Sequence, residues 1–213
     1  MAEELLNEGI EPVEDKGRVL VGLTKKSDNS KIAVTADRYE GLDKSSYVVD
    51  GIIIHIENED VDLLFSPNEV DAVMGEGSAD IPETDKRRNG QSPQINGTEY
   101  DGEERTAIQL ELHPEAQDDG CAVCEAIKFG WLPSYGEMTL LYKNKDVFNE
   151  LAKKTGIAPL SDVEYWTSTQ FSDDYMWSVD FANNIAEFWR SKSSTMKVRP
   201  CKSAVDYQET VNE

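Results

Sequence analysis

The feature that most restricts the fold is a change to a two-residue period after Ser161. Four short segments there alternate apolar and polar residues, and clusters of Ser, Asp and Asn separate them: 165–171, 175–181, 186–191 and 196–201. All four tryptophans lie between positions 131 and 189, so this half holds most of the large aromatic side chains available for a core. The pattern predicts a β-meander that closes the domain.

Helical signals precede this meander. Residues 115–129 place small apolar side chains and cysteines at helical spacing. A second helix is predicted after Ser134, because Glu137 three residues later completes a capping box. Asn144 is a candidate break in this helix, and Gly156 ends it.

The first half of the chain predicts further strands. A hairpin lies within residues 17–46, and a strand at 47–56 is nearly continuous in apolar residues, which is typical of a central strand. Its hairpin mate is predicted at 62–66, and residues 75–104, rich in Gly, Pro, Asn, Asp and Glu, predict a long loop. Because a two-stranded hairpin is marginal alone, the first hairpin must pack on the main domain or on another protein.

Four parts are therefore expected: an acidic arm at 1–16, an N-terminal hairpin and attachment module at 17–46, a main domain at 47–203 and a tail at 204–213. The arm has six acidic residues and no basic one before Lys16. That composition is typical of a segment that orders only against a partner. It is also the opposite of a secretory signal, which begins with basic residues, so Sec export is not expected.

The charge of the chain excludes two classes of partner. Its 42 acidic residues against 21 basic ones give a net charge of −21. Phosphate backbones and anionic lipid surfaces are held by Lys and Arg, so we expect neither nucleic acid nor a membrane surface as partner. Membrane insertion is not expected either, because the longest apolar run, around residues 51–54, falls far short of the roughly 20 residues that span a bilayer.

Three ordered motifs point to a known fold. The chain reads WLPSYGE at 131–137, YWTST at 165–169 and VRP at 198–200. This set resembles the C-type lectin-like fold, in the bacterial and phage branch that includes sulfatase-modifying-factor-like domains and target proteins of diversity-generating retroelements. The resemblance covers about residues 47–203. It implies an α+β domain with two helices packed on small twisted antiparallel sheets, here preceded by the hairpin and the acidic arm.

Each motif also has a plain structural role. Trp131 and Pro133 fix the entry of the second helix, and Trp166 and Trp177 are expected to interleave across a small sheet. Arg199 is expected to pair with a buried carboxylate.

The three cysteines allow two interpretations. Cys121 and Cys124, with Cys201 and His113, contain the residue types of a zinc site, but a second CxxC or a spaced His pair is missing. The alternative is that one of the first two faces the core, and the resemblance implies that the terminal strand brings Cys201 near it, without saying which of the two it would pair with. An odd number of cysteines and no export signal favour thiols in a reducing compartment.

Neither a cofactor nor catalysis is expected. The calcium-binding tripeptides of sugar-binding lectins, Glu-Pro-Asn or Gln-Pro-Asp and Trp-Asn-Asp, do not occur. The chain has two histidines, no plausible Ser-His-Asp or Cys-His set and no Gly-rich phosphate loop.

The remaining candidate is a binding surface. In the retroelement-diversified proteins that the chain resembles, exposed positions of the terminal meander form the binding face. The corresponding residues here are Asp173, Asp174, Tyr175, Asn183, Asn184, Glu187, Trp189, Ser191 and Ser193. Antibody paratopes favour the same mixture of Asn, Tyr, Ser and Trp. The alternative interpretation is that Asn183 and Asn184 only form a type I′ turn and that Trp189 only belongs to the core.

These features lead to a hypothesis about place and function. A lectin-like domain normally works outside cells, and a virion assembled in the cytoplasm needs no export signal. We therefore expect a bacteriophage structural protein, a head fibre, capsid decoration or tail-fibre component, that contacts other virion proteins through residues 1–46 and binds a host-surface glycan or protein. A homotrimer is the first expectation and a capsid-bound monomer the second.

Two alternatives are a decoration protein that binds nothing outside the particle and a bacterial cell-surface ligand-binding protein. An acidic ligand would require Lys192 and Lys197 to shield the face.

Overall fold

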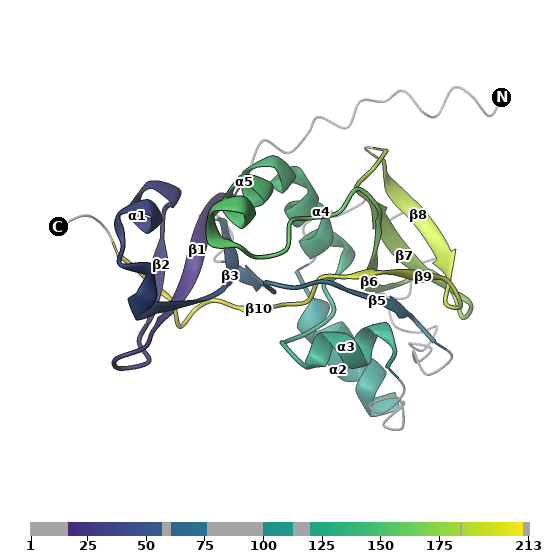
Figure 1. The fold of residues 1–213 in the computed structure, drawn as a ribbon. Helices are drawn as coiled ribbons and strands as arrows, with labels where there is room; N and C mark the ends of the chain where they lie inside the picture. The colour runs from purple at the N-terminus through teal and green to yellow at the C-terminus, as the bar shows by residue number, and fades with distance from the viewer. Residues whose placement is uncertain (1–16, 57–60, 76–99, 113–119, 184, 211–213) are drawn as a thin grey trace.

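The computed structural model describes residues 17–56, 61–75, 100–112, 120–183 and 185–210. Two sheets lie at opposite ends of the molecule, with helices between them, helices below them and a short helix beside the outer strands of one sheet (Figure 1). The strand order is β10-β4-β3-β1-β2-β11 in the six-stranded sheet and β5-β9-β6-β7-β8 in the five-stranded sheet. The α+β class is confirmed. Both sheets are mixed, however, because β11 runs parallel to β2 and β9 runs parallel to β6.

The elements have the following bounds. The six-stranded sheet contains β1 (Arg18–Lys25), β2 (Lys31–Val34), β3 (Tyr47–Ile56), β4 (Val61–Phe65), β10 (Cys201–Ser203) and β11 (Gln208–Glu209). The five-stranded sheet contains β5 (Val70–Val73), β6 (Glu164–Gln170), β7 (Tyr175–Asp180), β8 (Ile185–Ser191) and β9 (Thr195–Val198). The helices are α1 (Ala36–Gly41), the 3-10 helix η1 (Lys44–Ser46), α2 (Gly102–Leu112), α3 (Ala122–Ile127), α4 (Tyr135–Lys143) and α5 (Lys145–Thr155).

The N-terminal hairpin is part of the main sheet. Its strand β1 lies between β2 and β3, and Val21 is in register with Val34 on one side and Ile52 on the other. Of the two expectations for residues 17–46, the structure therefore has the hairpin packed on the main domain. The sheet continues across the boundary expected after residue 46, because β1 forms hydrogen bonds on both edges.

The end of the described chain returns to the same sheet. Strand β11 pairs with β2, and Arg18 forms an ion pair with Glu209. Ala204 is buried, and the Tyr207 hydroxyl donates to Asp50 at 2.9 Å. Ala204 and Tyr207 thus pack on one face of the sheet, and residues 208–209 extend its edge.

The terminal meander is confirmed for three of its four strands. Strand β7 pairs antiparallel with β6 on one side and with β8 on the other. The fourth predicted strand, 196–201, is wrong as a single element. Its first part, β9, lies between β6 and β5, and its second part, β10, belongs to the other sheet beside β4. The division falls at Arg199 and Pro200, where the proline lacks the N–H that a continuous ladder needs.

One helical prediction needs correction, and one helix was not predicted. The helix predicted over 115–129 is shorter, because Gly120 has a left-handed φ of 67° and Cys121 is the N-cap of α3. Residues 113–119 lie outside the described residues, as do most of the predicted loop at 75–104. Helix α2 was not predicted, and it begins at Gly102, so the loop predicted up to residue 104 is wrong at its end. Its sequence explains why: it buries Arg105, Thr106 and Gln109 instead of an apolar stripe.

The capping box and the two breaks are confirmed. The Ser134 hydroxyl accepts from the Glu137 N–H, and the Glu137 carboxylate accepts from the Ser134 N–H. Asn144 separates α4 from α5, and its side-chain amide donates to the Leu140 carbonyl at 2.9 Å. Gly156 closes α5 with a left-handed φ of 77°.

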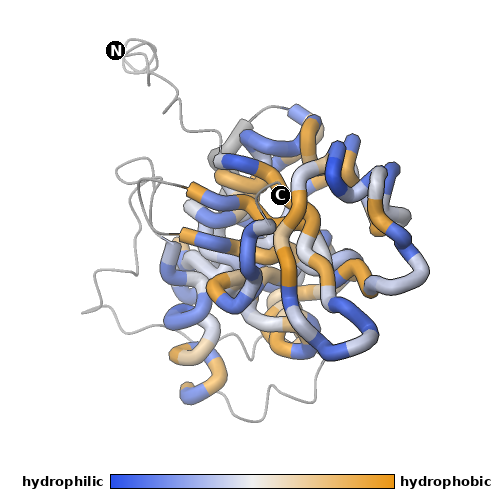
Figure 2. Tube along the Cα trace, turned by 90° about the vertical axis from the view of Figure 1, so that its left-hand side faces the viewer, coloured by the Kyte–Doolittle hydropathy of each residue, from blue (hydrophilic) through white to orange (hydrophobic). Residues whose placement is uncertain are grey.

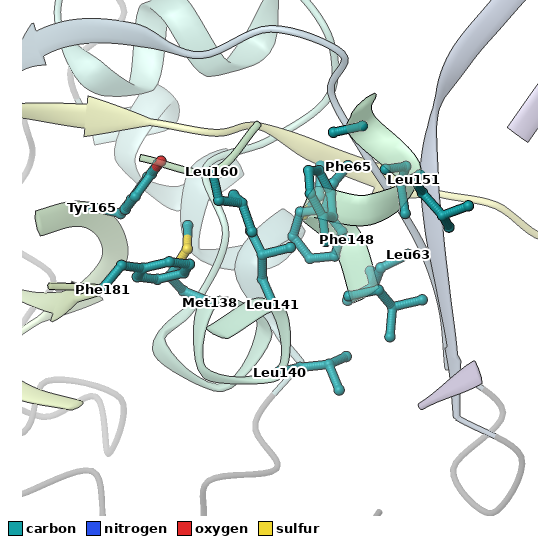
Figure 3. Close-up of a cluster of buried hydrophobic side chains, with 14 of the residues drawn as sticks. Leu63, Phe65, Met138, Leu140, Leu141, Phe148, Leu151, Leu160, Tyr165 and Phe181 are labelled. Carbon is teal, nitrogen blue, oxygen red and sulfur yellow. The ribbon is translucent and has the colours of Figure 1, made fainter. Parts of the chain in front are cut away.

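The main core lies between the sheets. Leu63 and Phe65 of β4 pack beside Phe148 and Leu151 of α5 (Figure 3). On the side of the five-stranded sheet, Tyr165 and Phe181 have ring centroids 4.6 Å apart. Hydrophobic and hydrophilic segments are interspersed along the described chain, as the orange and blue parts of Figure 2 show.

A second core covers the other face of the five-stranded sheet. It contains Trp166 and Met176 together with Met74 and Cys124, whereas Trp177 belongs to the main core. The expected interleaving of Trp166 with Trp177 is therefore wrong. Trp166 is in register with Ser178 instead, and the pleat sends successive residues of β7 to opposite faces.

Glu137 is a buried carboxyl at the junction of these elements. One oxygen, Oε2, accepts from the Ser134 N–H at 2.7 Å and from the Trp131 indole N–H at 3.2 Å. The Cys201 sulfur lies 3.8 Å from the same oxygen. Burial raises the pKa of Glu137 to about 7, although N–H groups from Ser134, Trp131 and Gly102 oppose that shift.

This raised pKa predicts a pH dependence of stability. Between the ordinary pKa of 4.5 and about 7, the folded state holds a proton that the unfolded state has released. The contribution of Glu137 to the free energy of unfolding is fully present below pH 4.5 and is lost as the pH rises through 7. Urea unfolding at pH 5, 6 and 7 should show wild type losing up to about 1.4 kcal/mol per pH unit relative to Glu137→Gln. Parallel pH profiles would contradict the shift.

Candidate functional site

A hollow of about 380 Å³ lies on the five-stranded sheet. It extends from β5 across β9 and the start of β6 to the end of β8. Its lining includes Asp71, Val163, Glu164, Arg190, Ser194, Thr195, Met196 and Lys197. This volume falls in the range of small-molecule sites, about 300–1,000 Å³.

Two ion pairs provide the polar groups of the hollow. Arg190 donates two hydrogen bonds to the Glu164 carboxylate. Its Nε donates to Oε2 at 2.6 Å, and its Nη2 donates to Oε1. Lys197 Nζ lies 3.0 Å from Asp71 Oδ2, because the two residues are directly opposite on β9 and β5. The hydrogen bond to Glu164 raises the pKa of Arg190. The lining thus holds two cationic and two anionic side chains.

The rest of the lining is apolar or carries hydroxyls. Val163 is 40% exposed and offers an apolar contact, whereas Met196 is only 7% exposed. Ser194 and Thr195 add hydroxyl groups at the turn that enters β9. The arrangement can both donate hydrogen bonds to a bound molecule and accept them from it.

The structure brings together only part of the predicted binding face. Tyr175 and Ser191 are opposite each other on β7 and β8, and the Lys192 N–H donates to the Asp174 carbonyl at 3.0 Å. Ser193 Oγ lies 2.9 Å from Ser191 Oγ. We call these residues, with the neighbouring exposed Asp173, the sheet tip. The sheet tip adjoins the hollow through Arg190 and Ser194.

Asn183 lies at the other end of the sheet. It follows β7, and its side-chain amide donates to Asp180 Oδ2 at 2.8 Å. Burial disfavours the charge on Asp180, but hydrogen bonds from Asn183 and Ala182 outweigh it and hold the pKa of Asp180 below its ordinary value. The nine predicted residues therefore do not form one patch, because the β7–β8 turn and the β8–β9 turn lie at opposite ends of β8.

Three predicted residues are only partly tested. Asn184 lies outside the described residues. Glu187 and Trp189 are placed in the backbone of β8, where Trp189 is in register with Trp177.

The two lysines that an acidic ligand would require as charge shields are not both available for that purpose. Lys192 is only 8% exposed. Lys197 is held by Asp71, and Glu69 lies 3.9 Å from its Nζ.

The cysteines are placed differently from the expectation. Cys121 and Cys124 lie together in the second core, whereas Cys201 packs in the main core against Glu137. The separation follows from the crossing at Pro200, which carries Cys201 into the six-stranded sheet. Within the described ranges, no group of three His, Cys, Asp or Glu side chains is placed to hold a metal ion, and His113 lies outside them.

Apart from Lys197, the residues of the hollow were missed by the sequence predictions. The alternation of β9 does place Thr195 and Lys197 on the face opposite Met196 and Val198. Strand β5, which supplies Asp71, is four residues long and followed by the predicted loop, so the sequence gives little sign of the partner strand.

Comparisons with known proteins add one structural similarity. No family model matches the chain, and a search of curated proteins finds no match. Among solved structures, a fimbrial protein from Bacteroides ovatus is similar over 91% of this chain and 45% of its own, with 16% sequence identity and a TM-score of 0.46. The chain thus spans less than half of that protein. None of the described helices is long and apolar enough to cross a membrane.

Proposed function

We propose that this chain is a bacteriophage virion protein, a head fibre, capsid decoration or tail-fibre component, whose C-type lectin-like domain binds a host-surface ligand. The observation that most supports binding is the hollow beside the sheet tip, with its two ion pairs and two hydroxyl residues. The order of the motifs at 131–137, 165–169 and 198–200 supports the lectin-like assignment.

A neutral saccharide is the ligand class that fits the hollow best. Its charged side chains balance, two against two, so the site offers no excess charge to an ionic ligand. Sugar hydroxyls can accept from Arg190 and Lys197 and donate to Glu164 and Asp71. The net charge of −21 disfavours acidic saccharides over longer distances.

Attachment to the particle is proposed through residues 1–46, as a homotrimer. Because β1 and β2 are inner parts of the sheet, the acidic residues 1–16 are the segment to remove in a test of attachment.

Mass spectrometry should find the chain in purified particles of the phage whose genome encodes it, with capsid or tail genes as neighbours. Detection only in a bacterial envelope would favour the cell-surface alternative.

The binding prediction is tested with a double variant, Asp71→Asn with Lys197→Gln. This change removes one ion pair of the hollow, and we expect at least a tenfold weaker Kd for a neutral host-surface saccharide on a glycan array. The matched control is Lys31→Gln with Asp206→Asn, which removes an exposed pair on the six-stranded sheet and should bind like wild type. Equal binding by the hollow variant would exclude this site.

A quadruple variant tests Tyr175 of the sheet tip, the predicted turn and Trp189 of β8. Replacing Tyr175, Asn183, Asn184 and Trp189 together by alanine should reduce adsorption while particle assembly continues. Unchanged adsorption, together with a wild-type chain that binds no saccharide, would favour the non-binding decoration.

A further inference from the structure

Cys121 and Cys124 are two buried thiols that the hollow does not use. Their Sγ atoms lie 2.7 Å apart, and the two residues are 3% and 2% exposed. An S–S bond is about 2.05 Å long, so a shift of less than about 1 Å brings the sulfurs to bonding distance.

The main chain holds the two sulfurs in this position. Cys121 is the N-cap of α3 with extended backbone angles, and its Sγ accepts from the Cys124 N–H at 3.3 Å. The Glu125 N–H donates to the Cys121 carbonyl at 2.9 Å and closes the turn. These two hydrogen bonds fix the turn, and the turn therefore keeps the two sulfurs close together.

The third cysteine has a different environment. Cys201 is fully buried in the main core beside Glu137, whereas the pair is packed in the second core with Met74 and Met176. We propose that Cys121 and Cys124 form an intrachain disulfide when the protein meets a disulfide oxidant, and that Cys201 remains a thiol. This modification is independent of the ligand proposed for the hollow.

The chemistry is thiol–disulfide exchange with a small disulfide such as oxidised glutathione. One cysteine thiolate attacks the oxidant, forms a mixed disulfide and releases one glutathione. The second thiolate attacks the protein sulfur of that mixed disulfide, forms the Cys121–Cys124 bond and releases the second glutathione. Two protein thiols and one oxidised glutathione thus give one protein disulfide and two reduced glutathiones.

Burial controls the rate of this reaction. It raises the pKa of Cys121 to about 11, so little thiolate exists at neutral pH in the folded protein. Exchange therefore follows local opening, or occurs during folding when the oxidant is present. A chain folded in a reducing cytosol keeps both thiols until it leaves that compartment.

The test counts thiols in the full-length protein. The chain is unfolded and refolded in a glutathione buffer, either oxidising or reducing, then denatured in acid and alkylated with N-ethylmaleimide. Intact-mass spectrometry should show one alkylated cysteine after oxidising refolding and three after reducing refolding. Peptide mapping should assign the single modified residue to Cys201. Oxidation should also raise Tm by a few degrees.

Two variants separate this pair from other pairings. Cys201→Ala should show no alkylation after oxidising refolding, because its two remaining cysteines are bonded. Cys124→Ser should show two alkylated cysteines in both buffers. Three reactive thiols in wild type after oxidising refolding, or a disulfide that includes Cys201, would overturn the proposal.

Discussion

Replacement of Arg199 by methionine should destabilise the protein by about 3–5 kcal/mol, the cost of breaking one side of a buried ion pair. Arg199 is 0% exposed. Its Nη2 lies 3.1 Å from Glu69 Oε2, and its two Nη atoms donate to the carbonyls of Ser66, Ala158 and Pro159 at 2.8–3.0 Å. Methionine fills a similar volume but leaves three carbonyls and the carboxylate without these donors. Denaturant unfolding measures the loss.

Lys197→Met is the matched control for this prediction. Lys197 is also near Glu69, at 3.9 Å, but its side chain is 24% exposed and its closer partner is Asp71. An exposed ion pair contributes at most about 1 kcal/mol, so this variant should unfold at nearly the wild-type denaturant concentration. If the two variants lost equal free energy of unfolding, charge at this end of β9, and not burial of Arg199, would determine the stability.

Deletion of residues 1–46 should abolish cooperative unfolding altogether. The deletion removes β1 and β2, which leaves one edge of β3 without a partner and takes Leu20, Val21, Leu23 and Val34 from the core. Each such side chain contributes about 1.5–3 kcal/mol through burial, and together they approach the whole stability of a typical domain, about 5–15 kcal/mol. Thermal melts followed by circular dichroism should show no sharp transition.

Deletion of residues 1–16 serves as the control, and it removes only the acidic arm that the sequence predicts to order against a partner. The variant that lacks residues 1–16 should have the same thermal transition as wild type. A cooperative transition in the variant that lacks residues 1–46 would instead support a separable module that ends at residue 46.

Local signals predicted a substantial part of the fold. Strand β3 has the predicted bounds, Tyr47 to Ile56, because a nearly continuous apolar run allows few other placements. The capping box and the left-handed Gly156 were likewise confirmed, since both depend on neighbours within four residues. The expected pairing of Arg199 with a buried carboxylate is also confirmed, with Glu69 as its partner.

The remaining parts depend on contacts between distant segments. Strand β9 leaves the meander because β5, more than 120 residues earlier, pairs with it, and no local pattern indicates that choice. Helix α2 buries polar residues, so hydrophobic periodicity does not reveal it. The hollow combines Asp71 with Glu164 and Arg190, so it could not be predicted before β5 and β9 were known to be neighbours.

The position of the two described chain ends has a consequence for orientation. Arg18, at the start of the inner strand β1, forms an ion pair with Glu209 of the edge strand β11. Both strands lie at the opposite end of the molecule from β8 (Figure 1). The five-stranded sheet therefore lies away from both residues, so a probe attached near Arg18 or near Glu209 leaves that sheet accessible.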